Sequence, residues 1–114
     1  MTIGIVSAGH MGSGLGWALQ AGGARVITAL DGRSARTAYL AAAAGLTAVA
    51  DLPELVRTAE VVLVVTPPGA ARSAARAVAT AARTTGSTPL VADLNAVSPS
   101  TVDELAAVYA EAGL

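Results

Sequence analysis

A glycine-containing turn close to the amino terminus restricts the folds open to this chain more than any other feature. Residues 2–16 read TIGIVSAGHMGSGLG. The apolar content of residues 2–7 predicts a short buried strand, and a helix follows to about Gly22. The turn between them consists of Ser7, Ala8, Gly9, His10, Met11 and Gly12. A strand, a glycine turn and a helix in this order are typical of the first β-α-β unit of a parallel sheet.

The same turn is suited to hold a phosphate group. The first turn of a helix has free backbone N–H groups and a partial positive charge, which attract a pyrophosphate. Gly9 leaves the backbone open to the phosphate, and Gly12 lets the helix lie against the strand. The spacing matches the dinucleotide-binding pattern G-x-G-x-x-G, except that Ser7 replaces the first glycine. Glycines after a strand also occur in turns that bind nothing, so a purely structural turn is the alternative.

The segment after the first helix carries the candidate ribose-binding residues. Residues 25–30 (RVITAL) predict the second strand. Asp31 then stands about 20 positions beyond the glycines, where the pattern has an acidic residue for the adenosine ribose hydroxyls. Arg33 and Ser34 indicate a different ligand, because a guanidinium and a hydroxyl at a helix start suit the 2′-phosphate of NADP. Arg36 lies one turn further on and could assist.

These residues favour NADP over NAD as the cofactor. A carboxylate beside the 2′-phosphate is unfavourable, so Asp31 has to turn away if NADP binds. The alternative is that Asp31 binds the ribose of NAD and that Arg33 is a solvated loop arginine.

The rest of the chain continues the alternation of helices and strands. Further strands are predicted at residues 46–50, 60–65 and 89–94, and helices at 34–45, 51–59, 70–83 and 98–112. The helix at 51–59 is expected to be only connective. Five strands with crossover helices predict an α/β fold, a Rossmann-like, doubly wound parallel sheet in the order 3-2-1-4-5. Helices on both faces would make it a three-layer α/β/α structure.

Two further segments are expected to border the ligand, because ligands of open α/β sheets bind beyond the carboxyl ends of the strands. Strand 60–65 ends at Thr66, Pro67 and Pro68, and two prolines cannot continue a central strand. Asn95 follows the fifth strand and offers both donors and acceptors for a carboxamide or a sugar hydroxyl. Each segment has a simpler alternative, a turn that only reverses or closes the chain.

The composition excludes several classes of function. The chain has 114 residues, enough for one domain, and a net charge of −1 without a basic patch, which argues against nucleic acid. It has no Lys and no Cys, and its only histidine is His10, so neither lysine chemistry, a thiol nucleophile nor a metal site is expected. We interpret His10 as a turn residue rather than a catalytic acid. No apolar run suggests a membrane span or signal peptide, so a cytoplasmic location is expected.

Four segments together resemble the β-hydroxyacid dehydrogenase superfamily, which includes 6-phosphogluconate dehydrogenase and 3-hydroxyisobutyrate dehydrogenase. They are IGIVSAGHMG at residues 3–12, LDGRS at 30–34, VLVVTPPG at 62–69 and DLNAVSP at 93–99. The resemblance covers the whole chain in order. It implies the NADP-binding domain of an oxidoreductase that transfers a hydride to or from a small hydroxy or oxo compound. The implied cofactor-binding residues are Ser7, Ala8, Gly9, His10, Met11, Gly12, Asp31, Arg33, Ser34, Thr66, Pro67, Pro68 and Asn95.

The sequence also departs from this superfamily. Its members continue with a substrate loop and a helical domain that carries a catalytic lysine, whereas this chain ends at Leu114. We therefore expect residues 1–114 to form a single NAD(P)-binding domain without the substrate domain, inactive in isolation and with no catalytic residue assigned. The alternatives are a stand-alone dinucleotide-binding module and an assembly module without turnover. The fifth strand would be an open sheet edge, so a homo-oligomer or a missing partner is expected.

Overall fold

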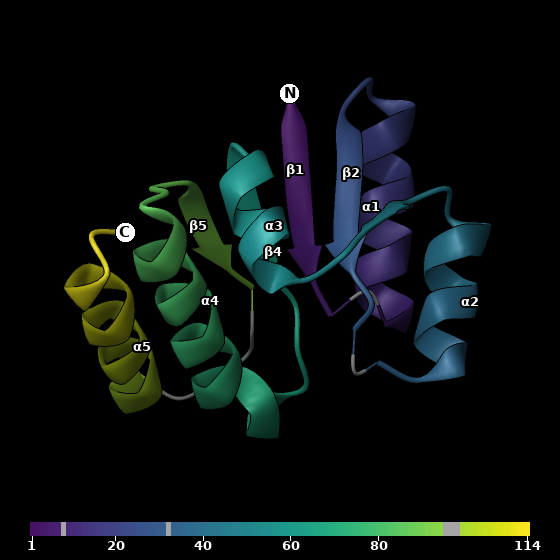
Figure 1. The fold of residues 1–114 in the computed structure, drawn as a ribbon. Coiled ribbons are helices and arrows are strands. Elements are labelled where there is room, and N and C mark those ends of the chain that lie inside the picture. Colours follow the sequence, from purple (N-terminus) through teal and green to yellow (C-terminus); the bar gives the residue numbers. More distant parts are fainter. Residues whose placement is uncertain (8, 32, 95–98) are drawn as a thin grey trace.

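Five parallel strands form the centre of the protein (Figure 1). The computed structural model describes residues 1–7, 9–31, 33–94 and 99–114. Its elements are β1 (Thr2–Val6), α1 (His10–Ala21), β2 (Arg25–Ala29), α2 (Ala35–Ala43), β3 (Thr47–Val49), α3 (Leu52–Thr58), β4 (Val61–Val64), the 3₁₀ turn η1 (Pro68–Ala70), α4 (Ala71–Thr85), β5 (Leu90–Asp93) and α5 (Pro99–Glu111). The strand order β3-β2-β1-β4-β5 confirms the predicted α/β topology.

The helices cover both faces of the sheet, as the sequence predicts. Successive strand residues point to opposite faces. On one face, Ile5 and Val26 pack with Ala41 of α2 and with Leu46. On the other face, the buried strand residues pack with α3, α4 and α5. These strand residues are Val6, Ile27, Val62 and Val64. The result is three layers, with α1 and α2 on one side of the sheet and α3 to α5 on the other.

Helix α3 contributes to the core, so the expectation that the helix at 51–59 is only connective was wrong. Two of its residues, Leu55 and Val56, are fully buried in the core. A Cβ atom at Gly4 of β1 would come within 2.6 Å of Leu55 Cδ2, so the helix packs directly on the central strand. Its first turn is a capping box, in which Asp51 Oδ1 accepts from the Glu54 N–H (2.9 Å) and Glu54 Oε2 accepts from the Ala50 N–H (3.0 Å). The helix thus begins where the sequence predicts, next to Asp51.

Helix α4 extends further than the sequence suggests. Residues 84–88 read as a polar loop, yet the helix continues to Thr85. The hydroxyls of Thr84 and Thr85 donate to the carbonyls of Thr80 and Ala81, both at 2.9 Å, so these polar side chains are satisfied inside the helix. The helix ends at Gly86, whose φ of 68° lies in the left-handed region that favours glycine.

Strand β5 lies at the edge of the sheet. Its only partner in the described part of the chain is β4, with Val91 opposite Val62. Leu90 is 69% exposed and Leu94 is 51% exposed. The expected open edge is therefore present, with unpaired backbone groups and apolar side chains beside it. Helix α5, predicted at residues 98–112, spans Pro99–Glu111, and Ser98 lies outside the described residues.

None of the helices in the described ranges combines the length and the apolar character that a bilayer crossing requires.

Candidate functional site

The carboxyl ends of β1, β2 and β4 meet beside the glycine turn, and two pockets lie there. The first pocket, of about 190 Å³, lies between the ends of β1 and β2 and the helices α3 and α4. The second pocket, of about 430 Å³, lies between the glycine turn, the start of α2 and the end of β4. Of the described residues, Ser7 alone lines both pockets.

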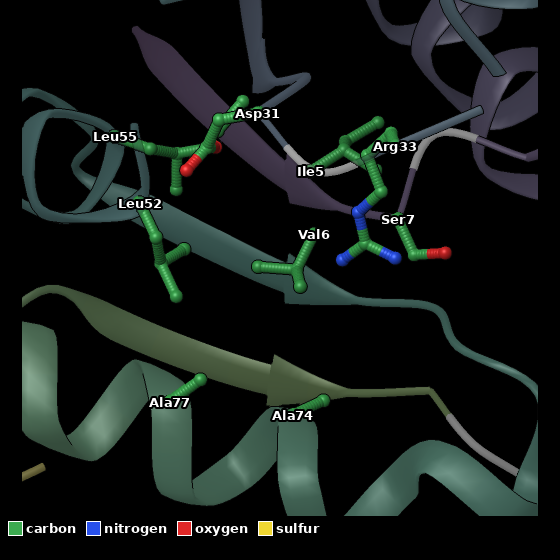
Figure 2. A pocket seen from close by; sticks show the side chains of 10 residues that line it. Ile5, Val6, Ser7, Asp31, Arg33, Leu52, Leu55, Ala74 and Ala77 are labelled. Carbon is green, nitrogen blue, oxygen red and sulfur yellow. The ribbon is translucent and has the colours of Figure 1, made fainter. Parts of the chain in front are cut away.

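The first pocket has an apolar floor and a polar rim (Figure 2). The floor consists of Ile5, Val6, Ala29, Leu52, Leu55, Ala74 and Ala77. The rim consists of Ser7, Asp31 and Arg33. The Arg33 side chain reaches toward Ser7, while Asp31 lies at the other end of the pocket near Leu55. The pocket can thus hold a flat apolar ring against its floor, and the Arg33 guanidinium can bind an anion at its rim.

The Arg33 guanidinium is held near the pocket without being neutralised. The backbone N–H of Arg33 donates to the Leu30 carbonyl at 3.0 Å, and this hydrogen bond fixes the loop after β2. Within the described ranges, Arg33 forms no ion pair with a carboxylate. The charge is therefore free to meet a ligand.

Ser34 takes a different place from its predicted partner Arg33. Its hydroxyl caps α2 by accepting from the Thr37 N–H at 3.2 Å, and it lies 3.1 Å from the Thr37 hydroxyl. Ser34 lines neither pocket, whereas Thr37 lines the second one. The sequence analysis missed Thr37, because a threonine in the first turn of a helix carries no distinctive signal.

The glycine turn ends against the positive end of α1. Gly9 is the N-cap, no side chain caps the helix, and its first turn contains no acidic residue. A Cβ atom at Gly9 would meet nothing within 4 Å, so the backbone there is accessible. A Cβ atom at Gly12 would come within 2.6 Å of the Ser7 carbonyl oxygen, so the helix can approach the strand only because Gly12 has no side chain. The first helix turn is thus exposed to a phosphate.

Ser7 has an unusual backbone conformation for its residue type. Its φ is 70°, and no other non-glycine residue in the described ranges has a positive φ. This left-handed region favours glycine, which is the residue that the G-x-G-x-x-G pattern has at this position. Ser7 therefore keeps the backbone shape of the pattern and adds a side chain to it.

The second pocket contains the residues predicted after β4. Thr66 and Pro67 line it together with Met11, Gly9 and Gly12. Pro68 begins η1, directly after them, and His10 begins α1. Ala8 and Asn95 lie outside the described residues.

The apolar floor of the first pocket was also missed. Leu52 and Leu55 come from α3, and Ala74 and Ala77 come from α4. Each pair has a spacing of one helical turn, which the sequence does show. The same spacing occurs in helices that face only the core, so it cannot distinguish a pocket floor from ordinary packing.

A hydrogen bond ties α5 to the end of β5. The Tyr109 hydroxyl donates to Asp93 Oδ2 at 3.0 Å. Burial, together with the nearby Asp93 carboxylate, raises the pKa of the Tyr109 phenol well above its ordinary value. Tyr109 thus stays neutral and holds Asp93 at the carboxyl edge of the sheet.

A second contact joins α4 to α5 on the surface. The Arg72 guanidinium and the Glu104 carboxylate lie 2.6 Å apart, and both side chains are more than half exposed. The hydrogen bond from Arg72 lowers the pKa of Glu104. Exposed pairs of this kind contribute little to stability.

Comparison with known protein families gives one match. The family described as "NADP oxidoreductase coenzyme F420-dependent" matches residues 2–91. No curated protein sequence matches the chain significantly.

Solved structures extend this likeness over nearly the whole chain. The conserved protein MTH1747, of unknown function and described as similar to 3-hydroxyacid dehydrogenases, has a TM-score of 0.84 and 28% identity over 96% of this chain. The 3-hydroxyisobutyrate dehydrogenase of Mycobacterium tuberculosis has a TM-score of 0.79 and 26% identity over 98%. An imine reductase from Myxococcus stipitatus, at 19% identity and a TM-score of 0.79 over 99% of this chain and 38% of its own, shares the fold. The present chain spans 40% and 37% of the first two solved chains.

Proposed function

The chain belongs to the "NADP oxidoreductase coenzyme F420-dependent" family, and we propose that residues 1–114 form a single domain that holds NADP at the carboxyl ends of its strands. The family match and the fold support binding of a nicotinamide dinucleotide. The observation that carries the choice of NADP is the Arg33 guanidinium, which lines the first pocket without a carboxylate partner among the described residues.

The two pockets and the glycine turn suggest how the cofactor lies. The adenosine half occupies the first pocket, on the floor that Leu52 and Ala77 help to form. The pyrophosphate lies at the start of α1, where no side chain caps the helix and the first turn contains no acidic residue. The nicotinamide half extends into the second pocket, past Thr66 and Pro67. Pro68 and Asn95, which follow the fourth and fifth strands in the sequence, are proposed to bind it as well. Ala8, His10 and Met11 complete the turn around the phosphates.

The polar rim supports NADP rather than NAD. The Arg33 guanidinium lines the first pocket, and the hydroxyls of Ser34 and Thr37 lie at the start of α2, which follows Arg33 in the chain. A 2′-phosphate bound at the first pocket meets the positive charge of Arg33, and we propose that the Ser34 hydroxyl reaches it as a donor. Asp31 lies at the other end of the first pocket from the guanidinium, so its carboxylate does not oppose that phosphate (Figure 2).

The activity proposed for the whole protein is hydride transfer between NADP and a small hydroxy or oxo compound. The nicotinamide supplies the chemistry, and the protein binds and orients it. The family description names coenzyme F420, which is therefore a second candidate for the hydride partner. Because the chain spans about 40% of the relative MTH1747, we propose that a second domain or a partner contributes the substrate site.

A module that binds a dinucleotide without turnover, or one that serves only in assembly, is the second candidate. Ser7 in place of the first glycine and the exposed edge of β5 favour the assembly role. We propose that this edge contacts a second copy or a partner.

Calorimetric titration of the purified chain with NADPH and NADH tests the cofactor. We expect NADPH to bind more tightly than NADH. Arg33→Ala should weaken NADPH about 10-fold or more and leave NADH unchanged, because hydrogen bonds to charged groups contribute about 1.5–3 kcal/mol.

Arg83→Ala is the matched control, because Arg83 is an exposed arginine in the last turn of α4 and lines neither pocket. It should leave both affinities unchanged. Equal loss of NADPH and NADH in Arg33→Ala would contradict a 2′-phosphate site at Arg33. Absence of binding by the folded wild type would leave only the assembly role.

A further inference from the structure

Ser7 lies at the point where a bound dinucleotide has to cross from one pocket to the other. It contributes to the rim of the first pocket and to the wall of the second, and it is the only described residue that does both. It directly follows β1, the central strand, and precedes the glycine turn at the start of α1. Any ligand that fills both pockets therefore passes its connecting group over Ser7.

Ser7 is half-buried and borders that path through both pockets. Its backbone φ of 70° turns the residue into a conformation that L side chains rarely adopt. In Figure 2 the hydroxyl points away from the Arg33 guanidinium. Across residues 1–7, 9–31, 33–94 and 99–114, no hydrogen bond involves this hydroxyl, so it is available to a ligand.

The connecting group of a dinucleotide is a pyrophosphate, and its oxygens accept hydrogen bonds. A serine hydroxyl is a donor that can rotate to meet such an oxygen. The start of α1, with no acidic residue in its first turn, lies beside the same place and attracts negative charge. A hydroxyl donor next to a helix N-terminus is therefore complementary to the phosphates in the crossing segment.

We propose that the Ser7 hydroxyl binds the phosphate chain of the cofactor, so that Ser7 determines affinity for the dinucleotide while Arg33 determines its selectivity. This inference rests on the proposed dinucleotide site. The phosphate chain is common to NADPH and NADH, whereas only NADPH carries the 2′-phosphate. Ser7 thus contributes equally to both cofactors, and Arg33 to one. Compared with the glycine of the pattern, Ser7 adopts the positive φ less easily but adds a hydroxyl donor.

The test is calorimetric titration of Ser7→Ala and Ser7→Gly with NADPH and NADH, together with their thermal unfolding. Both variants should weaken both cofactors by about 10-fold, with an unchanged ratio of the NADPH and NADH affinities, because each removes one hydrogen bond to a charged group. Ser7→Gly should also raise the unfolding temperature, because glycine tolerates a positive φ. Opposite changes in stability and affinity are not expected of a merely structural serine.

Ser87→Ala is the control, because Ser87 precedes β5 at the amino ends of the strands and lines neither pocket. It should leave both affinities as in the wild type. If Ser7→Gly binds as well as the wild type or more tightly, the hydroxyl has no binding role and the inference is wrong while the cofactor site stands. A loss confined to NADPH would also overturn it. If the folded wild type binds neither cofactor, the proposed function itself fails. Ser7→Gly keeps the test decisive should Ser7→Ala fold poorly.

Discussion

Gly12 sets the distance between α1 and the central strand. A Cβ atom there would lie 2.6 Å from the Ser7 carbonyl oxygen, which belongs to the backbone and cannot rotate away. Gly12→Ala should therefore lower the free energy of unfolding by about 1–3 kcal/mol, the usual cost of overpacking. Urea unfolding followed by circular dichroism measures it.

Gly14 provides the matched comparison on the same helix. A Cβ atom there would meet nothing within 4 Å. Gly14→Ala should raise the free energy of unfolding by about 0.5–1 kcal/mol, because alanine loses less backbone freedom than glycine in a helix. Equal effects of the two substitutions would mean that α1 does not approach β1 as closely as the structure has it.

The N-cap of α3 is the corresponding test at the scale of an element. Asp51 Oδ1 accepts from the Glu54 N–H, and the helix that follows supplies Leu55 to the core and to the first pocket. Asp51→Ala should lower the free energy of unfolding by about 1 kcal/mol, the typical value of an N-cap. Denaturant unfolding at neutral pH gives this value.

Asp103→Ala removes the same charge from the interior of α5, where Asp103 is exposed. It should leave stability unchanged or slightly increased, because alanine is a better helix former than aspartate. A loss in Asp103→Ala equal to that in Asp51→Ala would show that net charge, and not the cap, is responsible.

The elements differ in how far their sequences determine them. Caps and glycine stops are local, so the start of α3 next to Asp51 and the end of α2 just before Gly45 could be predicted. The burial of α3 could not be predicted, because it depends on Gly4, which lies far away in the sequence. Gly4 has no side chain, and Leu55 packs in the space that this leaves. For the same reason the strand order was predictable from connection rules, whereas the floor of the first pocket, formed by α3 and α4 together, was not.

The candidate site was partly predictable for a related reason. The glycine turn and Arg33 follow strand ends, and the carboxyl ends of parallel strands meet at one edge. Ser34 shows the limit of this reasoning, since its hydroxyl is engaged in capping α2 instead of lining a pocket. A sequence shows that a hydroxyl is present, but not whether it caps a helix or lines a binding pocket.

At the scale of the whole molecule, the chain contains no lysine and no cysteine, the two residue types other than tyrosine whose side chains ordinarily lose a proton between about pH 8 and 11. Burial raises the pKa of Tyr109, so the folded state keeps this proton after the unfolded chain, with an ordinary pKa of about 10, has lost it. Stability should therefore fall as the pH rises above about 10, by at most about 1.4 kcal/mol per pH unit for one proton. Urea unfolding at pH 8 to 11 measures the slope.

Tyr109→Phe should remove most of this alkaline dependence, although it also removes the hydrogen bond to Asp93 and lowers stability at pH 8. Tyr39→Phe is the control, because the Tyr39 side chain is largely exposed in the folded protein, and the wild-type slope should persist. A slope that survives in Tyr109→Phe would place its origin elsewhere.

The central position of β1 has a consequence for synthesis on the ribosome. Its neighbours are β2, which follows it closely, and β4, which begins only at Val61. At a translation rate of about 5–20 residues per second, several seconds pass between the synthesis of β1 and that of its neighbour β4. During that interval the nascent chain presents an unpaired apolar strand. Chaperones that recognise extended apolar segments could thus bind β1 during this interval.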